Sequence, residues 1–171
     1  MTNILTLRLD AASQAFFDTL RQRHFPPERN HIAAHVTLFH TLPPTEAITD
    51  VLARAAHAHA TFPLAVTGLR SLGKGVAYTL ASPPLQALHH ALASAFRDHL
   101  TPQDSQRFMP HVVVQNKVEP AQARLLLATL TETFQPFTAE ATGLDLWEYR
   151  NGPWHPLQTF RFHPAASSPT P

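Results

Sequence analysis

The stretches His35-Val36-Thr37-Leu38 and His111-Val112-Val113-Val114 predict the organisation of this chain of 171 residues. Each begins with a histidine and continues into a short run rich in β-branched residues, a pattern typical of a strand. Two histidines on strand faces can supply one general base and one general acid to a single reaction. This pair is therefore the first hypothesis for both the fold and the site.

Side chains alternate between the two faces of a strand, so each histidine shares a face with the residues two and four positions later. In the first strand these are Thr37 and Phe39, and in the second they are Val113 and Gln115, followed by Lys117. The intervening residues are expected to point into a core: Val36, Leu38, Val112 and Val114.

Two units with the same order of elements can be read along the chain: strand, helix, histidine strand, helix, strand. The hydrophobic periodicity and the turn residues predict strands at 4–9, 63–69, 76–81 and 137–149, with a final strand near 157–162. Asp10, Thr45 and Ser82 are the expected N-caps of the first three helices, and Glu119-Pro120 opens the fourth. The expected buried helix faces contain Ala12, Phe16, Leu20, Ile48, Val51, Leu52, Ala55, Ala56, Leu85, Leu88, Leu92, Phe96, Leu125, Leu126 and Leu130.

Two equivalent units predict an α+β fold that is bilobal, duplicated and pseudo-twofold symmetric. Its largely antiparallel sheets would be flanked by helices, and an active-site cleft between the lobes would bring the histidine strands together. Residues 1–163 are expected to form a single domain with lobes interleaved in space, and residues 164–171 a disordered tail.

Composition excludes several classes of protein. The 13 Lys and Arg nearly balance the 12 Asp and Glu, so a broad field for a long polyanion is not expected. With no cysteine, the chain has no disulfide, thiolate nucleophile or cysteine zinc site. No apolar stretch approaches the roughly 20 residues of a membrane span, and the N-terminus has no signal-peptide pattern. We expect a cytoplasmic protein with no membrane association and no obligate protein partner.

The 12 histidines have simpler interpretations that must be weighed first. Five lie in Ala-rich helical segments and are expected at the surface: His57, His59, His89, His90 and His99. The spacing of His31, His35 and His40 would serve zinc only on a helix, and the β-branched run argues against a helix there. No phosphate-binding loop for ATP is present. We therefore expect no metal and no other cofactor.

Paired imidazoles suit displacement at a phosphodiester. One takes a proton from the attacking water or hydroxyl while the other protonates the leaving oxygen, and a pKa of about 6.5 permits both states near neutral pH. A hydroxyl two residues after each histidine would lie on the same face and could bind a phosphoryl oxygen. Thr37 supplies this hydroxyl, whereas Val113 has a methyl group in its place.

The segments Ala34–Phe39 and Pro110–Lys117 resemble the His-x-Thr/Ser-hydrophobic motifs of the two-histidine (2H) phosphoesterase superfamily. The similarity is to its bacterial 2′,5′-RNA ligase-like branch, related to RNA cyclic phosphodiesterases, and the order of elements matches from Ile4 to about Phe162. The resemblance implies metal-independent cleavage of 2′,3′-cyclic phosphates, or reversible cleavage and formation of 2′,5′ linkages. The substrate would be an RNA end or a small nucleotide.

The resemblance also implies roles for four positions. His35 and His111 are the catalytic acid/base pair, Thr37 is a phosphate-binding residue, and Val113 occupies the second phosphate-binding position without its hydroxyl. Loss of one donor to a developing oxyanion can cost roughly 3–4 kcal/mol. Two rival interpretations stay open, namely a catalytically weakened nucleotide- or RNA-binding protein of the same fold and, in another class, a histidine-rich metal-binding protein.

Four further residues could contact a nucleotide but have simpler interpretations. Lys74, in a Gly-Lys-Gly turn, and Lys117 are expected to be solvated lysines. Tyr78 and Trp154 could stack on a base, yet core packing is the expected state of both.

Overall fold

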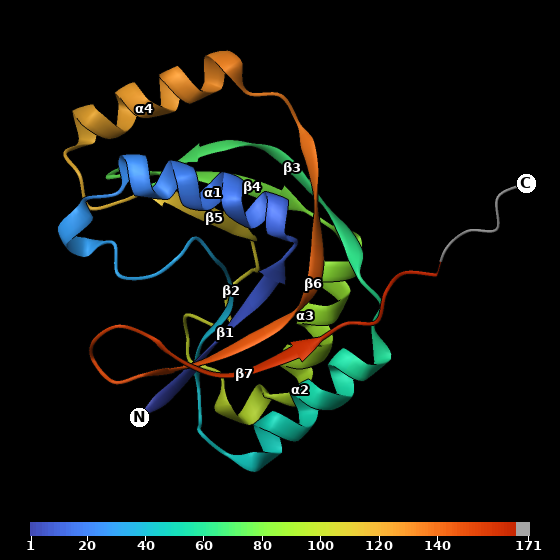
Figure 1. Cartoon of the computed structure of the whole chain (residues 1–171). Coiled ribbons are helices and arrows are strands. Elements are labelled where there is room, and N and C mark those ends of the chain that lie inside the picture. Colours follow the sequence, from blue (N-terminus) through green and yellow to red (C-terminus); the bar gives the residue numbers. More distant parts are fainter. Residues whose placement is uncertain (167–171) are drawn as a thin grey trace, which may run out of the picture.

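Seven strands form one curled antiparallel sheet, flanked by four α-helices, in a computed structural model that describes residues 1–166 (Figure 1). The strands are β1 (Thr2–Leu9), β2 (Val36–Leu42), β3 (Phe62–Ser71), β4 (Val76–Ala81), β5 (His111–Gln115), β6 (Phe137–Tyr149) and β7 (His155–Arg161). The helices are α1 (Ala11–His24), α2 (Glu46–Ala58), α3 (Pro83–Ala95) and α4 (Pro120–Thr133). Each half therefore has the predicted order of elements.

The strand order shows that the two halves of the chain have the same arrangement of strands. It runs β2-β1-β6-β3-β4-β5, with β7 added beside β6. Exchanging β1 with β4, β2 with β5 and β3 with β6 gives the same order read backwards. The α+β, pseudo-twofold fold predicted from the two histidine motifs is confirmed, and its strands form one continuous sheet.

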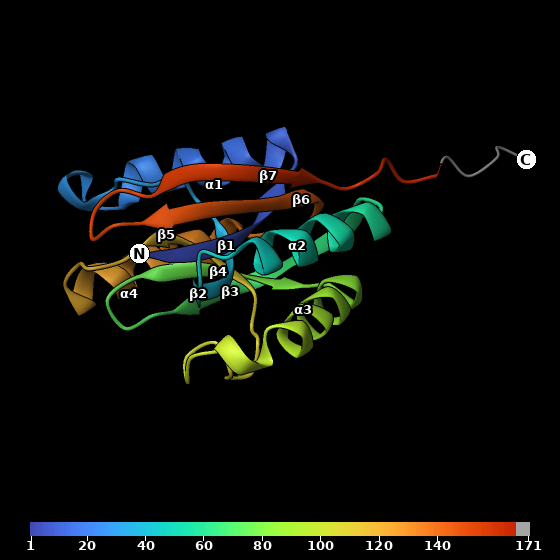
Figure 2. The same cartoon turned by 90° about the horizontal axis from the view of Figure 1, so that it is seen from below.

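Each half extends a helix to the histidine strand of the other half. Helix α1, from the first half, packs on β5, where Arg21 Nη1 donates to the carbonyl of Val113 at 2.9 Å. Helix α3, from the second half, reaches β2, where His89 Nε2 lies 3.2 Å from the carbonyl of Leu38. Figure 2 shows α1 and α3 on opposite sides of the sheet. The two histidine strands are therefore fixed by reciprocal contacts.

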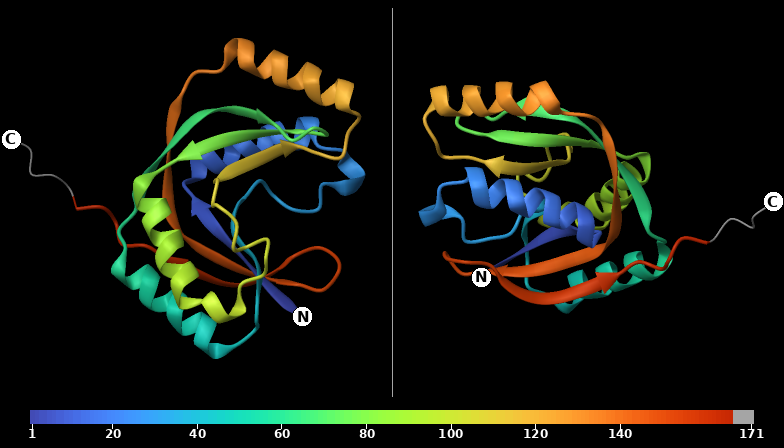
Figure 3. Two further views of the ribbon diagram at one scale, coloured as in Figure 1. Left: turned by 180° about the vertical axis from the view of Figure 1, so that it is seen from behind. Right: turned by 45° about the horizontal axis from the view of Figure 1, so that its top comes forward.

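The core fills the space between the sheet and these helices. Fully buried side chains come from both halves and include Phe17, Phe39, Phe96, Leu5, Leu64 and Leu144. Burial of such a side chain stabilises the fold by about 1.5–3 kcal/mol. Helices α2 and α3 lie side by side over one part of the sheet, as both views in Figure 3 allow the reader to follow.

The N-caps follow the prediction in part. Asp10 Oδ2 accepts from the backbone N–H of Ser13 at 3.0 Å, and Ser82 Oγ accepts from that of Leu85 at 3.3 Å. Thr45 occupies the cap position of α2 but its side chain makes no capping bond. Proline fixes the backbone at the first position of α3 and α4, as expected.

The buried face of α1 differs from the prediction. Phe17 and Arg21 are buried, whereas Ala12 is exposed and Phe16 is 42% exposed. The buried face of α1 is therefore centred on Phe17 and Arg21, and Arg21 makes hydrogen bonds to Asn30, Ile32 and Val113. Leu125 of α4, predicted in a buried stripe, is also exposed.

A β-bulge corrects the predicted faces of the first histidine strand. Leu5 pairs with Phe39 and its neighbour Thr6 pairs with Thr37, so Leu38 is an extra residue on β2. Phe39 consequently leaves the face of Thr37 and is fully buried in the core.

The second histidine strand, predicted to run from His111 to Val118, is shorter. It ends at Gln115, whose side chain is buried, and Lys117 has a left-handed backbone with φ 62°. Lys117 therefore does not share a strand face with His111. Of the predicted tail, residues 167–171 lie outside the described part of the chain, and the backbone N–H of Ala165 donates to Thr61 Oγ1 at 3.2 Å. No helix within residues 1–166 is long and apolar enough to cross a membrane.

Candidate active site

His35 and His111 make the same hydrogen bond at equivalent places in the two halves. His35 immediately precedes β2, and its Nδ1 lies 2.8 Å from the carbonyl oxygen of Ala33. His111 opens β5, and its Nδ1 lies 2.9 Å from the carbonyl oxygen of Met109. Because a carbonyl oxygen only accepts, Nδ1 carries a proton in both rings. Each neutral ring then has Nε2 available as a base.

Helix α1 fixes the backbone that leads to His35. Gln14 Nε2 donates to the carbonyl of Ala34 at 2.8 Å, and Asp18 Oδ1 accepts from the backbone N–H of the same residue at 2.8 Å. Arg21 Nε donates to the carbonyl of Ile32 at 3.0 Å. Three side chains of one helix thus hold the short segment that precedes His35.

Arg21 also reaches the strand of His111. It is only 5% exposed, and besides its bond to Val113 it donates from Nε to Asn30 Oδ1 at 2.8 Å. Its guanidinium lies 4.1 Å from the ring centroid of Phe25, which is a cation–π contact. Arg21 was not among the residues predicted from the sequence. The available signal was a cation on the same helix face as Phe17.

A buried carboxylate, likewise not predicted, fixes the loop that leads to His111. Asp104 accepts from the backbone N–H groups of His40 at 2.8 Å and Thr41 at 3.0 Å, and from His40 Nδ1 at 2.9 Å. Burial alone would raise the pKa of Asp104, but these hydrogen bonds outweigh it and hold the pKa below its usual value. The loop before His111 is thereby attached to the strand that follows His35.

One histidine predicted at the surface lies in the core instead. His89 is stacked between Phe39, at 4.7 Å between ring centroids, and Phe108, at 3.9 Å. Phe108 belongs to the same loop as Asp104. Burial lowers the pKa of His89, so the ring between the two aromatics is held in its neutral form.

A cavity of about 670 Å³ opens beside His35. Polar side chains line it, including Arg8, whose guanidinium pairs with the Asp145 carboxylate at 3.2 Å. Trp154 and Trp147 form its aromatic wall, and the Trp154 ring centroid lies 4.7 Å from that of His35. The core packing predicted for Trp154 is therefore wrong.

The prediction for Tyr78 is confirmed, because its ring is buried among Phe16, Phe17 and Phe134. Lys74 and Lys117 are exposed, as expected.

The environment of His35 favours its neutral form. Burial lowers its pKa to about 4, and the nearby positive charges of Arg21 and His111 act in the same direction. The hydrogen bond to Ala33 acts in the opposite direction and is outweighed. The His35 ring is thus neutral near pH 7, with its proton on Nδ1 and Nε2 free to accept one.

The two phosphate-binding candidates are positioned differently from each other. Thr37 pairs with Thr6 across β1 and β2, and its hydroxyl makes no hydrogen bond within residues 1–166. Val113 pairs with Ala77 across β4 and β5 and is half-buried. Strands β2 and β5 come into contact, but the cavity includes only one of the four predicted site residues, His35.

No group of three or more His, Cys, Asp or Glu side chains in the described part of the chain could hold a metal ion.

Solved structures share this curled sheet with its flanking helices. A protein of Thermus thermophilus, TT0787, is similar with a TM-score of 0.70 and 15% identity, over 97% of this chain and 100% of that one. E. coli LigT, in complex with 3′-AMP, has a TM-score of 0.60 and 18% identity, over 95% and 98%. A phosphoesterase has a TM-score of 0.59 and 20% identity, also over 95% and 98%. No curated protein sequence matches the chain.

The sequence profile of the 2′-5′ RNA ligase superfamily matches residues 9–153. The chain therefore belongs to this superfamily, the group of two-histidine phosphoesterases, as its motifs predicted.

Proposed function

We propose that the protein is a metal-independent phosphodiesterase that acts on 2′,3′-cyclic phosphate or 2′,5′-phosphodiester bonds of RNA ends or small nucleotides. The observation that carries this proposal is the matched hydrogen bonding of His35 and His111, which leaves both Nε2 atoms available for proton transfer. Superfamily membership supports the reaction class. The nucleotide complex of E. coli LigT supports the class of substrate.

The lowered pKa of His35 keeps its ring neutral with Nε2 free to accept a proton, so we assign His35 as the general base and His111 as the general acid. In hydrolysis, His35 Nε2 takes a proton from water as the water oxygen bonds to phosphorus. The bond from phosphorus to the leaving oxygen then breaks, and protonated His111 gives that oxygen a proton from Nε2. The net result adds one water across the phosphodiester. Each positioned acid or base contributes about 10²–10⁴-fold in rate.

Thr37 and the tryptophans provide the remaining contacts. The Thr37 hydroxyl, which makes no hydrogen bond within residues 1–166, lies on the strand that follows His35 and would donate to a non-bridging phosphoryl oxygen. Trp154 and Trp147 line the adjacent cavity, where a nucleobase can stack on an aromatic ring. At about 670 Å³, the cavity has room for a nucleoside.

The test is hydrolysis of a nucleoside 2′,3′-cyclic phosphate and of a 2′,5′-linked dinucleotide in excess EDTA. His35→Ala and His111→Ala should each lower kcat by at least about 100-fold. His99→Ala, which removes an exposed histidine from the turn after α3, is the matched control and should keep full activity. Undiminished turnover by either active-site variant would contradict the paired acid/base assignment.

Val113 favours a second candidate, a nucleotide- or RNA-binding protein of this fold with weakened catalysis. A methyl group there cannot donate to the developing oxyanion. Binding of a nucleoside phosphate by the wild-type protein, without hydrolysis of either substrate, would support this candidate over the first. Activity that EDTA abolishes would instead require a metal.

A further inference from the structure

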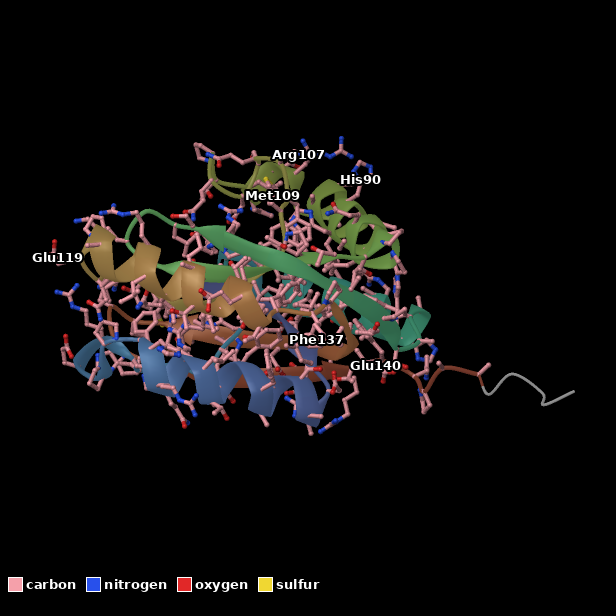
Figure 4. The ribbon with its side chains drawn as sticks, turned by 90° about the horizontal axis from the view of Figure 1, so that it is seen from above. His90, Arg107, Met109, Glu119, Phe137 and Glu140 are labelled. Atoms are coloured by element: carbon pink, nitrogen blue, oxygen red, sulfur yellow. The ribbon has the colours of Figure 1, made fainter. Side chains whose placement is uncertain are left out.

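A second cavity, of about 400 Å³, lies beside the segment that leads to His111. Met109 and Pro110, the two residues before His111, form one wall of it. Arg70 and Thr79, from strands β3 and β4, are also in its lining. Figure 4 shows Arg107 and Met109 close together at this edge of the molecule. This cavity is not used by the mechanism above.

The cavity is basic. Arg70 and Arg107 both line it, and none of its lining residues is Asp or Glu. Neither arginine has a carboxylate within 4.0 Å among residues 1–166. Two guanidinium groups without an acidic partner make a site for an anion, since the fork of an arginine matches the oxygens of a phosphate.

The register of the sheet places this basic cavity next to His111. Thr79 pairs directly with His111 across β4 and β5, and directly paired residues have Cα atoms about 4.5–5.5 Å apart and point to the same face. Arg70 pairs with Ala77, which in turn pairs with Val113, so it belongs to the adjacent row of the same face. Arg107 approaches from the loop, four residues before His111.

We propose that this cavity binds the phosphate of the nucleotide that follows or precedes the reacting phosphate in an RNA chain. The inference rests on the proposed function and assigns its substrate class. The preferred substrate is an oligonucleotide end, held by a nucleoside at the tryptophans, the reacting phosphate at the histidines, and a neighbouring phosphate at Arg70 and Arg107. A free nucleoside cyclic phosphate lacks this last contact.

The experiment compares two substrates of one chemistry: a nucleoside 2′,3′-cyclic phosphate and a trinucleotide that ends in the same group. Wild-type kcat/KM should be higher for the trinucleotide by about tenfold or more. Arg70→Gln and Arg107→Gln should each remove most of this preference. Raising the salt concentration should also reduce it, with the logarithm of the preference falling by about 0.7 per phosphate contact for each tenfold rise in salt. Arg54→Gln, which removes an exposed cation on α2, is the control and should keep the preference.

A direct binding measurement separates failure of this proposal from failure of the proposed function. Fluorescence anisotropy should detect tighter binding of a labelled trinucleotide 3′-phosphate than of a nucleoside 3′-phosphate, whether or not turnover occurs. Loss of that difference in Arg70→Gln and Arg107→Gln supports the phosphate site even in an inactive protein. The proposal would be overturned if the wild type bound both probes with equal affinity. It would also be overturned if each arginine variant lost the same affinity for the nucleoside 3′-phosphate as for the trinucleotide 3′-phosphate.

Discussion

Arg21 donates a hydrogen bond of 2.9 Å to the main-chain carbonyl of Val113, a residue 92 positions later in the chain. The same guanidinium donates to the carbonyl of Ile32, three residues before His35. One buried side chain therefore fixes the backbone on both sides of the proposed acid/base pair. Arg21 is a positioning residue, because it acts on the histidines through the main chain.

Replacement of Arg21 tests this relationship. Arg21→Met leaves two partly buried carbonyls without their donor and should lower the free energy of unfolding by about 2–4 kcal/mol, measured in urea. Arg21→Lys keeps the charge but not the fork, so it should lose less stability. Both variants should lower kcat more than they raise KM. A kcat for Arg21→Lys within twofold of the wild type would contradict the positioning role.

The charge of Arg21 also affects the pKa of His35, which would not depend on that charge if the role of Arg21 were purely structural. It is one of the positive charges that lower the pKa of His35, so Arg21→Met should raise that pKa while Arg21→Lys should not. NMR titration of the His35 ring follows this difference directly.

The fold could be predicted because most of its helices and strands are indicated by short stretches of neighbouring residues. Alternation along β1, the Gly73-Lys74-Gly75 turn and the Ser82-Pro83 helix start each determine one element, and the repeated order of elements predicts the symmetry. The bulge at Leu38 was not predictable, since it reflects the pairing of β1 with β2 rather than any turn residue. The face of Phe39 was therefore assigned wrongly.

Sequence reasoning proposes a site residue only where its chemistry lies in a short motif, and it proposes His35, His111 and Thr37 from their tetrapeptides. Asp104, by contrast, acts through backbone groups 63 and 64 residues away, and no local pattern indicates such a bond. Trp154 follows a turn that carries it over His35, so its position depends on the path of the chain into β7.

The pH dependence of stability should follow the lowered pKa of His35. Between its native pKa of about 4 and the ordinary value near 6.5, the unfolded chain binds a proton that the native protein does not. Stability from this group is therefore complete above pH 6.5 and is lost as the pH falls towards 4. The free energy of unfolding, measured in urea at several pH values, should fall more steeply with decreasing pH for the wild type than for His35→Gln. Parallel curves would contradict the assignment.

Activity should extend to lower pH for the same reason. If His35 is the base, kcat/KM should decline only as the pH approaches about 4, rather than near 6.5. An acidic limb centred near 6.5 would show that another group is the base.

Asp104 gives an independent stability prediction. Asp104→Ala removes the acceptor of two backbone N–H groups and should cost about 2–4 kcal/mol, whereas Asp104→Asn keeps one acceptor oxygen and should cost less. Because the native pKa lies below 3.8, the stability due to the carboxylate is complete above that pH and is lost as the pH falls below it. Acid unfolding of the wild type and of Asp104→Asn measures this loss, which should occur only in the wild type. Identical acid transitions would contradict it.

Trp154 should affect both binding and proton transfer. Trp154→Ala removes a stacking surface worth about 1–3 kcal/mol per base, so KM for a nucleoside substrate should rise roughly tenfold. It also uncovers His35, whose pKa should rise towards 6.5 because burial is the main cause of its lowering. Trp154→Phe keeps an aromatic ring and should change both KM and the pKa of His35 by less. An unchanged KM in Trp154→Ala would place the nucleobase elsewhere.

Val113→Thr tests whether the two halves can be made chemically equal. The bond from Arg21 uses the main-chain carbonyl of Val113, so the substitution leaves it in place, and threonine differs from valine by one hydroxyl at nearly the same volume. If the site uses this position, the new hydroxyl supplies an oxyanion donor, and kcat should rise by about tenfold or more, up to the 10²–10³-fold of a well-aligned donor. Val113→Ile, which adds volume without a donor, should give no increase. A threonine variant no faster than the wild type would mean that the phosphate is held on the Thr37 side alone, and that the asymmetry of the two motifs belongs to the working enzyme.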